Sequence, residues 1–315
     1  MKSCIDTILS IFVEPYENHL NSILDHSEEL LELLNISGAD IPSEYLSKKY
    51  SKQDLHHAHE WLIKYTQEHF FARKGERWEA EIPSWISENS EIMLRSAPNF
   101  FQALTAKKDP ELPKPDCICI LGASRNEAER RINTTIEYIK DGLKCENIYL
   151  LTGKRYIHGK ELTQVERLSL EKEFDKQDIT EADIMLSMYK NKTGLKPLLI
   201  NANPCNLNNA SIKNCNRNRP TTEDTVEAFL DTSPTYSEIV FVSGAPNTWP
   251  QHEAISSVMS RRDPNVKFEV VGAKGANLEG LSPDALSKVL YHVLMPFAGA
   301  LYGSAARVSK GIDQL

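Results

Sequence analysis

Beyond residue 116, hydrophobic residues occur in short continuous runs separated by amphipathic segments. This pattern is typical of a parallel sheet whose strands are buried on both faces and alternate with helices. We predict five strands, at Cys117–Leu121, Ile148–Leu151, Lys196–Ile200, Glu238–Val242 and Phe268–Val271. Helices are expected at Asn126–Leu143, 162–174, Thr180–Lys190, Thr222–Leu230 and 251–261. A long Asn-rich loop fills Asn201–Arg219, and a C-terminal helix pair is expected over Pro283–Ser309, broken near Pro296.

The first 112 residues follow a different pattern, with apolar side chains at spacings of three and four. Such spacing indicates amphipathic helices, which we expect over residues 3–13, 15–35, 51–71 and 83–106. Ser51, with Asp54 three residues later, is a suitable N-terminal cap. One helix carries His56, His59 and Glu60 on a single face. Two interpretations are open for that face, a metal site or, as we favour, a solvated polar surface.

The proline-rich stretch Asp109–Asp116 separates these two patterns and is the best domain boundary in the chain. We therefore predict a helical domain over residues 1–112 and an α/β domain over residues 113–315. The expected fold class is α/β, with a Rossmann-like parallel sheet of about five strands and helices on both faces, preceded by an all-α domain.

Composition narrows the functional classes. The formal net charge of -8 argues against a nucleic-acid partner, since phosphate-backbone binding relies on clustered Lys and Arg. No apolar run approaches the roughly 20 residues needed to span a bilayer. The six cysteines form no CxxC pair, which suggests a reduced, cytoplasmic protein. The high content of Asn, Lys, Ile and Glu is compatible with an AT-rich bacterial genome, so a role as a secreted effector stays open.

Three predicted strands end in glycine-containing turns. If these strands are neighbours, their loops meet at one edge and present backbone N–H groups, small hydroxyls and cations, a chemistry suited to a small anion. Ordinary tight strand–helix turns are the alternative interpretation. The candidate residues at these turns are Gly122, Ala123, Ser124, Arg125, Thr152, Gly153, Lys154, Arg155, Ser243 and Gly244.

Carboxylates near the same turns offer proton transfer or metal binding. Glu181 and Glu227 are the candidates for a general base or a metal ligand, although acidic residues at a helix start are also favoured by the helix dipole. Ser124 and Ser243 have no evident base, and no Walker A loop or complete GxGxxG motif is present.

The order of these pieces resembles the ElyC/SanA/YdcF family of bacterial α/β proteins over about residues 117–272. The resemblance rests on ILGASRNEAERRI, LLTGKR, TEADIM, the Thr-rich segment Thr222–Ala228 and IVFVSGAPNTWPQHEAI. The chain departs from the family at Ala228, where the family has Asn. It also has Asn247 and Gln251 where the family presents His and Arg.

The resemblance implies an enzyme, a hydrolase or transferase, acting on a nucleotide, phosphosugar or phospholipid-carrier head group. Arg125, Lys154, Arg155 and Arg219 are expected to bind phosphate and Thr222 and Thr225 to shape the pocket, and Asn247 is a further candidate for ligand binding. The cofactor is open, with S-adenosylmethionine and Mg²⁺ as candidates. The alternative is a non-catalytic S-adenosylmethionine or nucleotide sensor whose helical domain contacts a protein partner.

Overall fold

Five strands in the second part of the chain pair side by side and run in the same direction. The computed structural model describes residues 2–14, 27–71, 81–153, 155–157, 161–195, 197–202, 220–232 and 236–315, apart from the side chains of residues 13 and 200–202. The strands are β1 (Cys117–Leu121), β2 (Asn147–Gly153), β3 (Leu198–Ala202), β4 (Glu238–Gly244) and β5 (Lys267–Ala273). Their order is β3-β2-β1-β4-β5, as in Rossmann-like folds.

Residue contacts divide the chain into two units. The α/β unit comprises Lys107–Gly244 and Ala254–Ala273, and the helical unit comprises Met1–Ala106, Ala245–Glu253 and Lys274–Leu315. The division predicted from sequence assigned all of residues 113–315 to the α/β domain. In the structure, the C-terminal helices pack with the N-terminal ones, because their apolar faces contribute to the same core.

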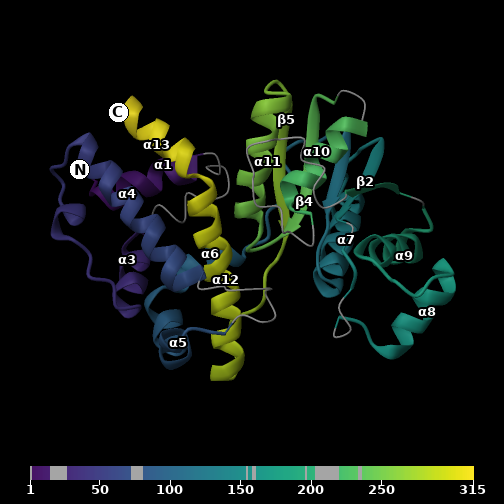
Figure 1. Cartoon of the computed structure of the whole chain (residues 1–315), viewed down its shortest axis with the longest axis horizontal. Helices are drawn as coiled ribbons and strands as arrows, with labels where there is room; N and C mark the ends of the chain where they lie inside the picture. Colours follow the sequence, from purple (N-terminus) through teal and green to yellow (C-terminus); the bar gives the residue numbers. More distant parts are fainter. Residues whose placement is uncertain are drawn as a thin grey trace. The chain divides into compact units, whose positions relative to one another are not determined.

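Alternate residues of β1 pack against helices on opposite faces of the sheet. Cys117, Cys119 and Leu121 face α10 (Thr222–Thr232) and the later part of α11 (Thr248–Arg262). Ile118 and Ile120 face α7 (Arg125–Lys140) and α9 (Glu181–Thr193). Figure 1 shows these helices alongside the strands. This two-residue alternation confirms the predicted Rossmann-like parallel sheet with helices on both faces.

An additional helix, α8 (Gln164–Phe174), lies between β2 and α9 in the sequence. It packs on a small apolar cluster of its own, which shares the half-buried Met188 with the cluster under α7 and α9. Leu170 is the buried residue of this helix, whereas Val165 and Leu168 are 78% and 58% exposed. The segment is therefore attached to the sheet much less deeply than its neighbours.

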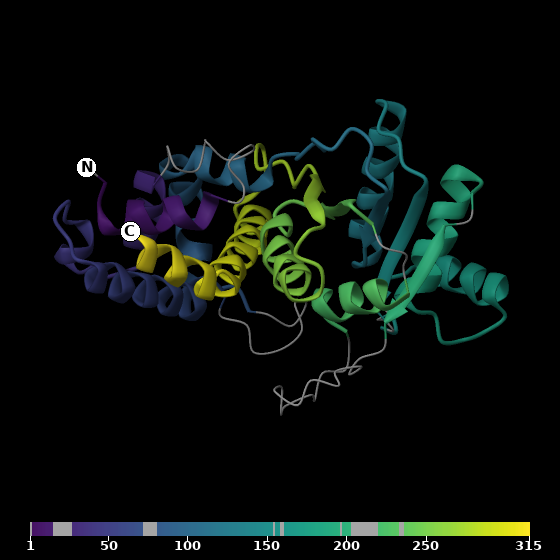
Figure 2. The ribbon, with the colours of Figure 1, turned by 90° about the horizontal axis from the view of Figure 1, so that it is seen from above.

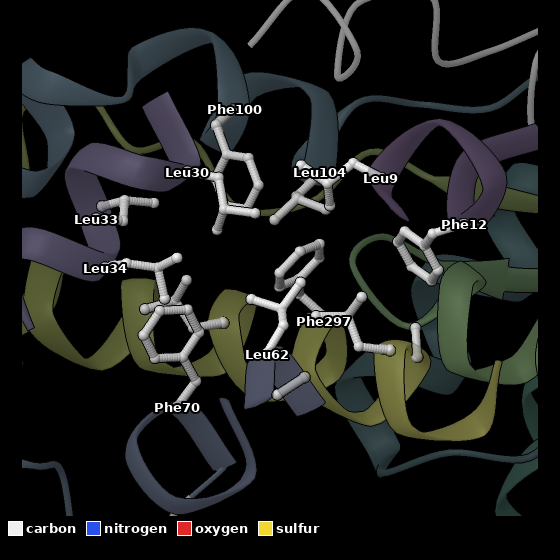
Figure 3. Close-up of a cluster of buried hydrophobic side chains, with 14 of the residues drawn as sticks. Leu9, Phe12, Leu30, Leu33, Leu34, Leu62, Phe70, Phe100, Leu104 and Phe297 are labelled. Carbon is white, nitrogen blue, oxygen red and sulfur yellow. The ribbon is translucent and has the colours of Figure 1, made fainter. Parts of the chain in front are cut away.

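The helical unit joins segments from both ends of the chain around one apolar core. Figures 1 and 2 show the C-terminal helices beside the N-terminal ones. In the close-up of Figure 3, Phe297 of α12 points toward Phe12 and Phe100, and its ring lies 6.0 and 5.1 Å from theirs between centroids. The helices of this unit are α1 (Cys4–Val13), α3 (Ser27–Ile36), η2 (Ser43–Leu46), α4 (Lys52–Thr66), η3 (Gln67–Phe71), α5 (Ser84–Ser96), α6 (Pro98–Thr105), α12 (Pro283–Gly303) and α13 (Ala305–Gln314).

The predicted break near Pro296 is wrong. Helix α12 continues through Pro296, and the bend of 54° falls between Gly303 and Ala305. A proline removes one helical hydrogen bond, but the residues around Pro296 are buried in the core, and this packing outweighs the loss. The segment 83–106, predicted as one helix, is divided at Ala97, just before Pro98, because proline disfavours the helical conformation of the preceding residue.

The polar face predicted around His59 is not solvated at that residue. His59 is only 3% exposed, and its Nε2 atom has no hydrogen-bond partner among the described residues. Over the same residues, no group of three His, Cys, Asp or Glu side chains is arranged to hold a metal ion. His56, one turn earlier, instead pairs with Asp313 of α13 at 2.9 Å.

No single helix in the described parts of the chain has the length and apolar character to cross a membrane. The bent pair Pro283–Gly303 and Ala305–Gln314 reaches that length and composition only when its two helices are taken together. Most of the α12 side chains from Leu286 to Leu301 are buried in the helical unit.

Candidate functional site

The strand order brings the three candidate turns to one edge of the sheet. β1 lies between β2 and β4, with Leu121 opposite Leu151 and Ile120 opposite Val242. The three strands are parallel, so the turns that follow them lie at the same carboxyl edge. Between β1 and β4 the helices that follow the strands change from one face of the sheet to the other. In open α/β sheets such a position is where ligands bind.

Arg155 is the centre of a buried charge cluster at this edge. Its Nε atom donates to Glu181 Oε2 at 3.0 Å, and its Nη1 and Nη2 atoms donate to the two carboxylate oxygens of Glu161 at 2.6 and 3.2 Å. Nη2 also donates to the carbonyl of Ala123 at 3.3 Å. Arg155 and Glu181 are 9% and 7% exposed. The guanidinium group thus joins the ends of β2 and β1 to the start of α9.

Backbone pairing fixes Arg155 opposite Glu181. The N–H of Glu181 donates to the carbonyl of Arg155 at 2.9 Å, and the N–H of Ile157 donates to the carbonyl of Ile179 at 3.0 Å. Thr180 begins α9 with a capping box, in which its N–H and hydroxyl both donate to Asp183 at 2.7 Å. Glu181 is therefore the first residue of α9, where the helix dipole favours a carboxylate.

Glycines at two strand ends leave room for carboxylates. A Cβ atom on Gly122 would collide with Glu181 Oε1, and one on Gly244 would collide with Glu127 Oε1. At the end of β2, a Cβ atom on Gly153 would lie 3.0 Å from the ring of Pro220, which precedes α10. These glycines thus permit close approach of side chains as well as a change of chain direction.

Arg131 is a buried cation at this edge that the sequence analysis missed. It is 2% exposed, and its Nη1 atom donates to the carbonyls of Leu121 and Gly122 at 2.9 and 2.8 Å. Its Nε atom lies 3.5 Å from Glu127, which also pairs with Arg130 at 3.2 Å. The sequence does carry a signal for it, because Arg131 lies on the same face of α7 as Ala128, Ile132 and Thr135.

Burial and charge shift the pKa values of these groups in opposing directions. Burial raises the pKa of Glu181, while the charge of Arg155 and the N–H of Gly153 oppose that rise. For Arg155, burial alone would lower the pKa, but the carboxylates of Glu161 and Glu181 outweigh it and raise the pKa. Burial lowers the pKa of Arg131, against the charges of Glu127 and Glu181. The cluster therefore holds full charges in a poorly hydrated place.

Arg125, the other predicted phosphate ligand in the described chain, is also bound to carboxylates. It begins α7 and donates to Glu129 and Glu166, each at 2.7 Å. Ser124 precedes it as the N-cap residue, without a side-chain capping bond. Thr152 and Ser243 are fully buried at the ends of β2 and β4.

The remaining candidates are not all near this cluster. Glu227 pairs with Arg261 and Arg262 at the end of α11, at 3.2 and 2.6 Å, and with none of the strand-end cations that the structure describes. Thr225 donates to the carbonyl of Thr222 at 2.8 Å within α10. Asn247 belongs to the segment Ala245–Glu253 of the helical unit. Lys154 and Arg219 lie outside the described residues.

No protein-family model, curated protein or solved structure matches this chain. The resemblance to the ElyC/SanA/YdcF family, drawn from the order of short motifs, therefore stays a prediction. The chemistry of the cluster can still be described from its residues. Arg155 presents paired N–H groups that suit an oxyanion, and Glu181 is a buried carboxylate whose raised pKa suits proton transfer.

Proposed function

We propose that the α/β unit binds a small anionic or nucleotide-like ligand at the carboxyl ends of β2, β1 and β4. We further propose that it acts on this ligand as a hydrolase or transferase of the ElyC/SanA/YdcF type. The substrate class would be a nucleotide, a phosphosugar or a phospholipid-carrier head group.

The observation that carries the proposal is the burial of Arg155 and Glu181 at the edge of the sheet next to the change of helix side. Ionised groups are rarely buried in proteins without a partner or a functional reason, because the loss of hydration is costly. Here a guanidinium and a carboxylate, each less than 10% exposed, lie beside Gly122 and Gly153. Clusters of this kind at the strand ends of an α/β sheet are typical of ligand sites.

In this proposal each residue has a distinct role. Arg155 binds the phosphate or carboxylate of the ligand through its paired N–H groups. The turn Gly122–Ser124 brings the backbone and the start of α7 close to the ligand. Glu181 accepts a proton, since burial moves its pKa upward toward the range in which a general base works. We assign no catalytic role to Glu227, because its carboxylate binds Arg261 and Arg262 of α11 and is not part of the cluster around Arg155.

One observation favours the alternative, a non-catalytic sensor of S-adenosylmethionine or a nucleotide. Arg125 and Arg155 each bind two carboxylates, and the ion pairs of Arg130, Arg131 and Lys192 bring the connected network to five cations and five carboxylates, so its charge is balanced. A ligand that carries both signs of charge, together with ribose hydroxyls, fits a balanced site better than a polyphosphate does. S-adenosylmethionine is such a ligand.

A thermal-shift screen tests the proposal. The panel contains nucleotides, nucleotide sugars, S-adenosylmethionine and its demethylated product, each with and without magnesium. A ligand at 100 times its Kd stabilises the folded state by about 2.7 kcal/mol, which gives a clear rise in Tm. A hit is then assayed for turnover, and turnover separates the enzyme from the sensor.

The site is tested with Arg155→Lys, which keeps the charge but loses the paired N–H groups. We expect this variant to bind the hit at least about tenfold more weakly. Arg262→Lys is the matched control, because Arg262 also bridges two carboxylates, Glu227 and Asp231, away from the strand ends. Each shift is measured from the variant's own unliganded Tm, so that loss of stability is not mistaken for loss of binding. Equal affinity in Arg155→Lys and the parent protein would overturn the site assignment.

A further inference from the structure

Two carboxylates of one short segment bind two of the three arginines that the sequence analysis assigned to phosphate. Glu161 bonds both terminal nitrogens of Arg155, and Glu166 bonds Arg125 at 2.7 Å. The carboxylates come from residues 161 and 166, whereas the arginines follow two different strands, β2 and β1. A single segment thus neutralises cations from two neighbouring turns.

We infer that the segment Glu161–Phe174, hereafter the α8 segment, is an anionic lid over an oxyanion site formed by Arg155 and Arg125. Its two glutamates occupy the positions that the phosphate groups of a ligand would take, and the ligand displaces them. The inference rests on the proposed function and deepens it, because it assigns the ligand at least two anionic groups, as in a diphosphate.

The contact between Glu161 and Arg155 has the geometry of a bound oxyanion. Two parallel N–H···O bonds join the two groups, the arrangement that arginine makes with carboxylate and phosphate alike. Glu181 holds the Nε atom of the same guanidinium from the opposite side, which fixes its orientation. A ligand phosphate that replaces Glu161 would therefore find the N–H groups already directed toward it.

The α8 segment is built so that it can separate from the sheet as one piece. Its apolar contacts are confined to the small cluster around Leu162, Leu170 and Ile184, and its outer face exposes Val165 and Leu168. Elements with few buried apolar contacts open most readily. Its polar attachment includes the two arginine contacts at its N-terminal end and one bond near its C-terminal end, which the Ser187 hydroxyl of α9 donates to Glu173 at 2.7 Å.

The helix itself does not depend on these two contacts. Thr163 begins α8 with a capping box, in which its N–H and hydroxyl donate to Glu166 Oε2 at 2.9 and 2.8 Å. The other oxygen of Glu166, Oε1, binds Arg125. A Gln at position 166 can keep the capping box while it removes the charge that faces Arg125.

The test compares Glu161→Gln, Glu166→Gln and the double variant with Glu171→Gln. Glu171 lies on the same helix, and no ion pair to an arginine is found for it among the described residues, so this control makes the same change of charge. The first measurement is hydrogen–deuterium exchange of the α8 amides without ligand. We expect at least about tenfold faster exchange in the double variant and none of this increase in the control. Equal protection in the two would overturn the lid.

The second measurement is calorimetric titration of each variant with inorganic pyrophosphate in magnesium-free buffer. Removal of the competing carboxylates is expected to raise the affinity for pyrophosphate about tenfold or more over the control. An affinity that is unchanged or lower in the double variant would overturn the oxyanion site under the lid.

Failure of this inference can be told apart from failure of the proposed function. If the parent protein binds a nucleotide through Arg155 but the double variant shows neither faster exchange nor tighter pyrophosphate binding, the lid is wrong and the proposed function stands. If α8 is released and pyrophosphate binds more tightly while no ligand of the panel is bound or turned over, the lid stands and the proposed function is wrong.

Discussion

Each unit contains an arginine that donates to two consecutive backbone carbonyls and lies beside a glutamate. In the helical unit, Arg307 donates to Ile11 and Phe12, each at 2.9 Å, and to Glu253 at 2.8 Å. In the α/β unit, Arg131 donates to two carbonyls at the end of β1, at 2.9 and 2.8 Å. The side chain of Arg307 is 29% exposed, whereas that of Arg131 is 3% exposed.

The comparison shows when a structural role alone explains an arginine that binds backbone carbonyls. The carbonyls of Ile11 and Phe12 belong to the last turn of α1, so Arg307 caps the end of a helix and complements its dipole. Arg131 does not cap a helix. It is fully buried beside Glu127 and Glu181, at the strand ends where a ligand is proposed to bind. A folding role is sufficient for Arg307, whereas the cluster around Arg131 also calls for a functional reason.

The largest expected effect comes from replacing Arg131 by Met. The long apolar side chain fills most of the volume, but the carbonyls of Leu121 and Gly122 lose a buried donor and Glu127 loses a neighbouring cation. Breaking such a buried pair costs about 3 kcal/mol. We expect the free energy of opening, measured by hydrogen exchange at the β1 amides, to fall by that amount.

Arg307→Met is the matched variant in the helical unit. Solvent reaches its site, so water can replace part of what is lost, and we expect a cost of about 1.5 kcal/mol at the α1 amides. If both variants lost the same free energy of opening, the comparison would fail, because burial would then not affect the cost of removing the arginine. A neutral or stabilising Arg131→Met would mean that the buried charge is retained at no benefit to stability, which leaves function as its reason.

The fold could be predicted from the sequence wherever burial on both faces produces a continuous apolar run. The bounds of β1 were predicted without error, because CICIL is apolar throughout and is bounded by Asp116 and Gly122. β3 begins two residues later than expected and continues to Ala202, since the run KPLLI does not itself mark where pairing with β2 begins. Pro296 misled the analysis because a local rule was applied to a helix whose packing overrides it.

The candidate site was predictable only in part, because its partners meet through long-range contacts. The sequence places Arg155 and Glu181 after β2 and at the start of α9, but their pairing depends on the antiparallel bridge between Tyr156 and Thr180. Nothing in the local sequence distinguishes Glu181 from Glu227, which has other partners. Arg131 was missed because it was interpreted only as a residue of the helix that follows β1, and not as part of the site at the strand ends.

The next prediction concerns His59, the one ionisable side chain that is buried on α4. Burial, together with the charge of His56, lowers the pKa of His59 from 6.5 to about 4. The side chain is therefore neutral in the folded protein at neutral pH, in contrast to the charged groups at the strand ends. The unfolded chain takes up the proton near pH 6.5, so the stabilising contribution is complete above that pH and is lost as the pH falls toward 4.

The loss amounts to about 2 kcal/mol, less than the shift alone would give, because relaxation and water penetration on protonation reduce the cost of a buried charge. Hydrogen exchange of the α4 amides in urea, carried out on the whole protein at a series of pH values, measures this loss of stability. His59→Leu removes the titrating group but not the many carboxylates, so the difference between the two proteins isolates His59. A difference that stays constant between pH 7 and pH 4 would contradict the prediction.

The smallest effect is expected from Glu227→Gln, a charge outside the strand-end cluster. Glu227 pairs with Arg261 and Arg262, whose side chains are 48% and 41% exposed. Exposed pairs of this kind contribute about 0.5 kcal/mol, because water and salt screen them and the long side chains lose freedom. Urea unfolding should show a loss of that size that shrinks at high salt, with no change in the affinity for a ligand of the strand ends. A loss of ligand binding would instead return Glu227 to the site, and the charges on the helices could then no longer be separated from those at the strand ends.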